Sequence, residues 1–115
     1  MSANLELVRR HVDAFNAADL DALLADFAPD ATWVMGETVV PAEELPDLFG
    51  RAVHYLDPHL TLIRVVDGGD AVAVELHERW TQDGEAKDAM LLALLDVHEG
   101  KVRRGKVYRE GSAGA

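Results

Sequence analysis

The chain of 115 residues contains no cysteine, which excludes disulfides, thiolate nucleophiles and cysteine-ligated zinc or iron–sulfur centres. It also lacks an apolar run long enough to span a membrane. The opening residues, MSANLELVRR, do not contain the apolar region of a signal peptide. We therefore expect a cytoplasmic protein that has no membrane partner.

Basic residues are few, because 11 Lys and Arg stand against 21 Asp and Glu. The resulting net charge of −10 argues against nucleic acid or an anionic membrane as the main partner. It favours a neutral or cationic small ligand. The length fits one domain, and the apolar fraction of 49% is enough for one modest core.

The first half of the chain predicts three helices. One face of a helix over residues 4–16 is marked by apolar side chains at spacings of three and four: Leu5, Val8, Val12 and Phe15. Asn4 is expected to cap that helix, and Asp19 a second, short helix over residues 20–27. An apolar stripe predicts a third helix over residues 42–56.

The remaining apolar segments predict strands separated by turn sequences such as DGGD and QDG. The expected strands cover residues 31–35, 59–67, 71–81, 86–98 and 101–110. Helices followed by a strand meander predict an α+β domain with the helices on one face of the sheet.

The segment AMLLALL, residues 89–95, is apolar at both alternating sets of positions. A strand of this kind is covered on both sides. One cover is the layer of helices. Because no further helix is predicted, the other cover is expected to be a second copy of the chain, in a homodimer built sheet to sheet.

Two segments resemble a known superfamily: RRHVDAFNAADLDALLADFAPDATW near the start and LLDVHEGKVRRGKVYRE at the end. Both are similar to nuclear-transport-factor-2-like proteins, which include SnoaL-like polyketide cyclases, ketosteroid isomerases and limonene epoxide hydrolases. The resemblance implies one domain over residues 1–110. The low-complexity end GSAGA, residues 111–115, is expected to be a disordered tail. It implies a cone-shaped, curved, antiparallel or mixed sheet around three helices, with a pocket at one end.

The catalytic acids of these relatives do not carry over to this sequence. The resemblance places the oxyanion-hole tyrosine of ketosteroid isomerases on His11, their proton-shuttling aspartate on Met35 and their protonated aspartate on Leu92. It places the two aspartates of limonene epoxide hydrolases on Thr81 and Val107. Neither mechanism is therefore expected here.

Glu78 is the polar residue that the strand pattern singles out. In VAVELHERWTQDG it alternates onto one face with Val72, Val74, Leu76 and Trp80, and the resemblance gives the same phase. A buried carboxylate is costly unless it is paired, protonated or used. We expect Glu78 to act as a general acid or base, with His11 as its proton relay or as an oxyanion donor.

The same phase predicts a mostly apolar pocket around these two catalytic candidates. Its expected ligand-binding residues are Trp33, Met35, Phe49, Val53, Leu76, Trp80, Met90, Leu92, Val107 and Arg109. Such a pocket suits a small apolar or aromatic molecule held by a few polar groups. No cofactor is expected. No metal is expected either, because the remaining histidines show no tight ligand spacing.

Simpler interpretations of the same residues stay open. Glu78 can form an ion pair with Arg64 or Arg109, or lie at the wet end of its strand. His11 can be an ordinary core histidine. Three functions follow: a pocket protein that catalyses proton transfer on its ligand, a non-catalytic binding module, and a dimerisation domain whose cone is filled by side chains.

Overall fold

Three helices and six strands make up residues 2–110, which the computed structural model describes. The helices are α1 (Ala3–Asn16), α2 (Leu20–Ala25) and α3 (Leu45–Tyr55), and a 3-10 turn, η1 (Ala42–Glu44), leads into α3. The strands are β1 (Phe27–Met35), β2 (Thr38–Pro41), β3 (His59–Asp67), β4 (Ala71–Gln82), β5 (Glu85–His98) and β6 (Lys101–Arg109). The tail predicted for residues 111–115 lies outside the described residues.

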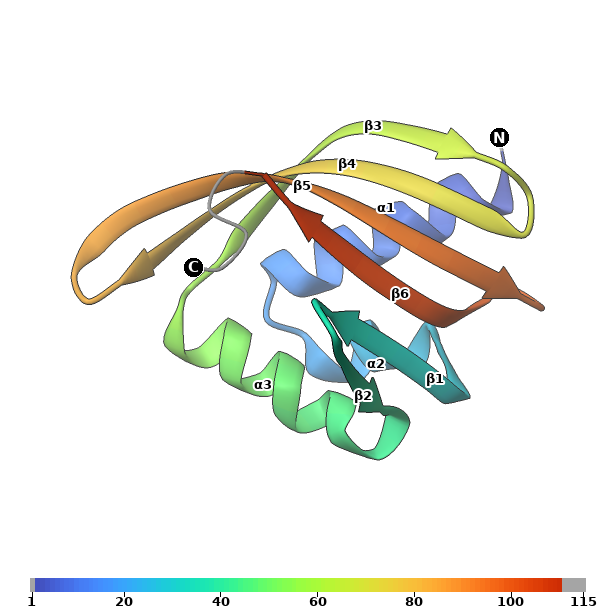
Figure 1. Cartoon of the computed structure of the whole chain (residues 1–115), viewed down its shortest axis with the longest axis horizontal. Coiled ribbons are helices and arrows are strands. Elements are labelled where there is room, and N and C mark those ends of the chain that lie inside the picture. The colour runs from blue at the N-terminus through green and yellow to red at the C-terminus, as the bar shows by residue number, and fades with distance from the viewer. Residues whose placement is uncertain (1, 111–115) are drawn as a thin grey trace.

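The strands form one curved, open sheet in the order β2-β1-β6-β5-β4-β3. All neighbouring strands are antiparallel except β1 and β6, which run parallel. Figure 1 shows the helices on one side of this sheet, with α1 running beneath β4 and β5. The predicted α+β architecture is confirmed, although the short strand β2 was not predicted. Within the described residues, no helix has the length and apolar character to cross a membrane.

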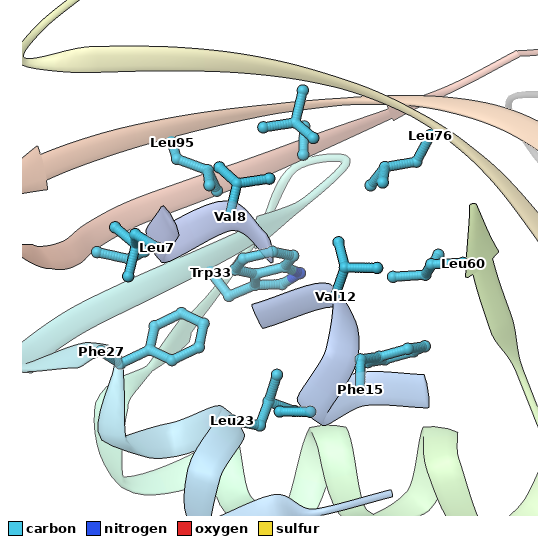
Figure 2. Close-up of a cluster of buried hydrophobic side chains, with 14 of the residues drawn as sticks. Leu7, Val8, Val12, Phe15, Leu23, Phe27, Trp33, Leu60, Leu76 and Leu95 are labelled. Atoms are coloured by element: carbon cyan, nitrogen blue, oxygen red, sulfur yellow. The ribbon is translucent and has the colours of Figure 1, made fainter. Parts of the chain in front are cut away.

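The core lies between α1 and the face of the sheet that the helices cover. In it, Val8 of α1 points toward Leu95 of β5, and Val12 points toward Leu60 of β3 and Leu76 of β4 (Figure 2). The buried residues of this cluster include Leu7, Val8, Val12 and Phe15 on α1, and Val72, Val74, Leu76, Leu91, Ala93 and Leu95 on the strands. This packing makes the helix-covered side the inner face of the cone.

The start of α1 differs from the predicted cap. Ser2 is the N-cap residue, because its hydroxyl accepts a hydrogen bond from the Leu5 backbone N–H at 3.0 Å. Asn4 instead donates its side-chain amide to Asp67 Oδ1 at 2.9 Å and to the Gly69 carbonyl at 2.8 Å. Donation from Asn4, followed by bonds from Gly69 and Ser2, lowers the pKa of Asp67. Asn4 therefore ties α1 to the β3–β4 turn.

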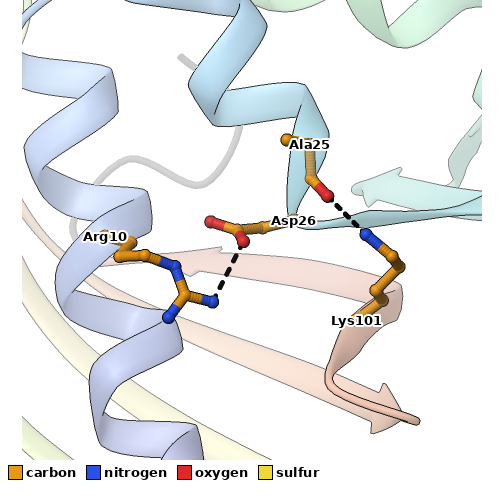
Figure 3. A network of polar contacts seen from close by, with 4 residues as sticks. All are labelled: Arg10, Ala25, Asp26 and Lys101. Carbon is orange, nitrogen blue, oxygen red and sulfur yellow. Dashed lines mark hydrogen bonds and ion pairs between the residues drawn. The ribbon is translucent and has the colours of Figure 1, made fainter.

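Asp26 anchors the end of α2 to both α1 and β6. Arg10 NH2 lies 3.1 Å from Asp26 Oδ1, and the Asp26 carbonyl accepts the Val102 N–H at 2.8 Å. Lys101 Nζ donates to the Ala25 carbonyl at 2.7 Å, which satisfies a free carbonyl at the helix end (Figure 3). The Asp26 side chain is only 12% exposed, so its charge depends on Arg10.

Replacing Asp26 with alanine is expected to lower the free energy of unfolding by about 2 kcal/mol, because a charge-assisted hydrogen bond is lost. The expected loss of free energy is small because the Arg10 side chain is 56% exposed and water replaces part of its interaction with Asp26. Urea unfolding measures the change. Asp30→Ala is the matched control on β1, since Asp30 is exposed and 3.7 Å from Arg103. Equal losses in the two variants would contradict the anchoring role.

Candidate functional site

Strand β4 carries Glu78 on the inner face, as the alternation predicted. Val72, Val74 and Leu76 are buried, and the Glu78 side chain, next on the same face, is 14% exposed. Thr81 N–H donates to the Leu56 carbonyl at 3.0 Å, so the end of β4 is held against the end of α3. Glu78 thus lies where the sheet and α3 approach each other.

Glu78 forms an ion pair with Arg109. The sequence had left Arg64 and Arg109 as alternative partners. Arg109 NH1 donates to Glu78 Oε1 at 2.7 Å, and its Cζ lies 5.4 Å from the centre of the Trp80 ring. The pairings Glu78–Ala89 and Leu91–Arg109 bring the two side chains together across β5. Among residues 2–110, no other group makes a hydrogen bond to the Glu78 carboxylate, so Oε2 is available.

Apolar side chains continue this surface along β6 and β1. Val107, two residues before Arg109, lies on the same inner face of β6. It pairs with Met35, which is 48% exposed at the end of β1. We call the group formed by Met35, Glu78, Trp80, Val107 and Arg109 the mouth residues. They combine one ion pair with an aromatic ring and two aliphatic side chains.

His11 lies deeper, among aromatic rings. Its ring centroid is 5.6 Å from that of Phe27 and 6.5 Å from that of Trp33. The residue as a whole is partly exposed, but Nδ1 is shielded from solvent and has no hydrogen-bond partner. Burial lowers the pKa of His11 from 6.5 to about 4, and the negative charge of Asp26 opposes this shift. His11 is therefore neutral at pH 7.

No hydrogen bond joins His11 to Glu78 in residues 2–110. The two catalytic candidates have different surroundings: Phe27 and Trp33 border His11, whereas Arg109 holds Glu78. A proton relay between them needs a bridging group from a ligand or water.

Aromatic rings fill the interior of the cone next to His11. Phe27, Trp33 and Phe49 are all buried, and their ring centroids lie 5.3 to 5.9 Å apart. The Trp33 ring lies directly on Gly105, where an added Cβ would come within 2.5 Å of Cε3 and closer still to Cζ3. Trp33 and Phe49 are thus packing residues of this interior, and the predicted Val53 packs half-buried at its edge.

The predicted phase of β5 is wrong. Leu76 on β4 pairs with Leu91, and the inner face of β5 consists of Leu91, Ala93 and Leu95, all buried. Met90 and Leu92, expected in the pocket, point to the opposite face, where Leu92 is 43% exposed. Alternation could not choose between the two phases because both faces of this strand are apolar.

Two hollows in the described surface are not centred on the mouth residues, although Trp80 borders the larger one. The larger, of about 400 Å³, is bordered by the ends of β3, β4 and β5, including His59, His77 and Arg79. The smaller, of about 210 Å³, lies on α3 beside Arg51 and Tyr55. Within residues 2–110, no three His, Asp or Glu side chains gather as metal ligands.

A family model for the SnoaL-like domain matches residues 8–105, which include most of α1, all of β4 and three of the five mouth residues, Met35, Glu78 and Trp80. The chain belongs to the SnoaL-like domain family. No curated protein matches it.

Solved structures share the fold of this SnoaL-like chain at low sequence identity. A protein from Jannaschia sp. CCS1, described as a SnoaL-like polyketide cyclase, is 19% identical with a TM-score of 0.84, over 94% of this chain and 85% of that one. An LEH-like epoxide hydrolase from M. tuberculosis is 15% identical with a TM-score of 0.83, over 94% and 83%.

A third structure is a ketosteroid isomerase-like protein from Catenulispora acidiphila, determined in complex with trimethylamine. It is 20% identical with a TM-score of 0.80, over 90% of this chain and 84% of that one. These three likenesses confirm the predicted nuclear-transport-factor-2-like fold.

Sequence reasoning missed the inward side chains of β5 and the contact of Trp33 with Gly105. A glycine in the middle of a strand was the available signal for the second, since it often marks a close approach of another group. The sequence contained no signal for the inward side chains of β5, because both faces of that strand are apolar.

Proposed function

We propose that this SnoaL-like protein binds a small, largely apolar molecule that carries one hydroxyl or amine group, at the mouth residues. The observation that carries the proposal is the half-occupied carboxylate of Glu78. Arg109 holds Oε1 at 2.7 Å, and no group of residues 2–110 donates to Oε2. The Glu78 side chain is 14% exposed, and Oε2 can accept a hydrogen bond from a ligand that reaches it from the surface.

The other mouth residues suit the apolar part of such a molecule. Met35 and Val107 offer aliphatic surface, and Trp80 offers a ring that an aromatic ligand can contact. Since the interior next to His11 is filled by Phe27, Trp33 and Phe49, the ligand is held close to the surface.

Two further facts favour a neutral or cationic ligand. The net charge of −10 repels anions at long range. The ketosteroid isomerase-like protein from Catenulispora acidiphila was determined with trimethylamine, a small amine. A small amine is therefore one class of ligand that we propose for this chain.

Binding of 2-naphthol is the direct test, because it has one donor on an apolar ring system. We expect NMR shift changes at Met35, Trp80 and Val107. Glu78→Gln keeps the shape but converts one carboxylate oxygen into an amide donor, and should weaken 2-naphthol roughly tenfold. The methyl ether of 2-naphthol, which has no donor, should bind both proteins equally.

Glu85→Gln is the matched control, because Glu85 is an exposed glutamate at the start of β5. It should leave the 2-naphthol affinity unchanged. Shift changes that avoid the mouth residues, or equal effects of Glu78→Gln on the naphthol and its ether, would refute the proposal.

Proton transfer on the bound molecule is the second candidate function, and the free Oε2 of Glu78 favours it. A group that receives a ligand proton must lie within hydrogen-bond reach of it, and Oε2 has no donor from residues 2–110 that would compete with the ligand. His11 would take part through its unpaired Nδ1 only if the ligand or a water connects it. Turnover of a substrate by Glu78→Gln at the wild-type rate would exclude this role for Glu78.

A further inference from the structure

The larger hollow, where β3 begins beside the end of β4, is bordered by charged groups of both signs. Its volume is about 400 Å³, which lies in the lower part of the range for small-molecule sites. Two acids and two cations lie on its border together with two histidines: Asp57, Asp88, Arg79, Lys87, His59 and His77. The hollow is therefore a polar site, in contrast to the largely apolar mouth.

Most of these charges have partners within the protein. Asp88 is directly opposite Arg79 on the neighbouring strand, but its Oδ2 lies 2.8 Å from His77 Nε2 instead. Lys87 Nζ lies 3.7 Å from Glu85 Oε2. The carboxylate nearest in register to Arg79 is thus already engaged by a histidine.

Arg79 and Asp57 are the two charges that remain. Within residues 2–110, neither side chain forms a hydrogen bond or an ion pair, and they do not contact each other. Arg79 is opposite His59 on β3, and Asp57 comes two residues before His59, so both charges lie at the same end of the hollow's strands. Opposite charges that share one hollow without meeting leave room for a molecule that carries both signs.

We propose that the larger hollow is a second ligand site, which binds a small zwitterion of the amino-acid type. The Arg79 guanidinium holds the carboxylate of the ligand, because its planar fork matches that group. The Asp57 carboxylate accepts hydrogen bonds from the ammonium group. Trp80 and Ala86, which also border the hollow, contact the aliphatic part. The site is separate from the ligand proposed for the mouth and does not depend on it.

The charges select a zwitterion over simpler ligands. A net charge of −10 repels a free anion, whereas a zwitterion has no net charge. A simple anion would leave Asp57 unmatched, and a simple cation would leave Arg79 unmatched. A metal ion does not fit, because no three His, Asp or Glu side chains of residues 2–110 gather as ligands and two cations border the hollow.

NMR titrations of the full chain with 4-aminobutyrate, butyrate and butylamine test the proposal. The three molecules share an aliphatic chain, but only 4-aminobutyrate carries both charges, and its flexibility lets them adopt a range of separations. We expect saturable shift changes at His59, His77 and Thr81. The affinity for 4-aminobutyrate should be about fivefold higher than for either of the other two molecules.

Two variants assign the two ends of the ligand. Arg79→Gln should weaken 4-aminobutyrate and butyrate about fivefold and leave butylamine unchanged. Asp57→Asn should weaken 4-aminobutyrate and butylamine by a similar factor and leave butyrate unchanged. Asparagine suits this position, where φ is 46°, because it tolerates the left-handed region.

Arg64→Gln and Asp83→Asn are the matched controls, since they make the same charge changes outside the hollow. Arg64 is exposed on β3, and Asp83 has a φ of 53° in the β4–β5 turn. Neither control should change any of the three affinities. Equal effects of Arg79→Gln and Arg64→Gln would mean that only net charge matters, and would overturn the site. Equal affinities for the three molecules, or shift changes at Met35 and Val107 in place of the hollow, would also overturn it.

Discussion

Replacing Gly105 with alanine is expected to lower the free energy of unfolding by about 3 kcal/mol, at the upper end of overpacking costs. The added Cβ would overlap the Trp33 ring, coming within 2.5 Å of Cε3. The ring cannot move away freely, because Phe27 and Phe49 border it and Trp33 is 8% exposed. Urea unfolding monitored by circular dichroism measures the loss.

Gly50→Ala is the matched control for this prediction. Gly50 lies in α3, and its added Cβ would meet only Leu20 Cδ1, at an ordinary contact distance of 3.5 Å. It should be neutral or stabilise the protein by up to about 1 kcal/mol, since alanine favours a helix.

The double variant Gly105→Ala/Trp33→Leu separates overlap from other effects. If the clash with the ring causes the loss, Gly105→Ala should cost much less when Trp33 is already leucine. Strictly additive losses would mean that Gly105 has another role. Gly105→Ala with wild-type stability would show that Trp33 does not lie on β6.

This contact also marks where sequence reasoning stops. Trp33 and Gly105 are neighbours because β1 and β6 run parallel, and that pairing joins segments from the two ends of the chain. Local patterns predict a strand at each position, but not which strands pair. The same holds for Arg109, whose choice over Arg64 as partner of Glu78 depends on the register of β4, β5 and β6.

The phases of two strands show what alternation can decide. On β4, charged residues such as Glu75 and Arg79 alternate with Val74 and Leu76, so the inner face could be predicted. On β5, both faces are apolar over residues 89–95, and the phase was assigned one residue out of step.

The stability of the protein is expected to fall as the pH is lowered from about 6.5 to 4, in part because of His11. Burial lowers the pKa of His11 from 6.5 to about 4. Between these values the unfolded chain binds a proton at His11 that the folded chain does not. Protons therefore favour unfolding in this range, and the contribution is complete below about pH 4, where it reaches about 3 kcal/mol.

The charges around His11 leave the sign of this effect unchanged. Asp26 favours the protonated ring, but its charge is shared with Arg10 at 3.1 Å, and desolvation remains the larger cause. Asp67 acts in another range, because its pKa is lowered from 3.8. Its contribution is present above pH 3.8 and is lost as the pH falls further.

His11→Leu should remove this pH dependence. Leucine keeps an apolar contact with Phe27 and Trp33 and leaves no unsatisfied Nδ1, so stability at pH 7 should be unchanged or higher. Urea unfolding at pH 7, 5.5 and 4 should give a smaller decrease for His11→Leu than for the wild type. His54→Leu on exposed α3 should keep the wild-type decrease. Equal decreases in the free energy of unfolding for the wild type and His11→Leu would contradict the prediction. They would mean that His11 binds a proton as readily in the folded protein as in the unfolded chain.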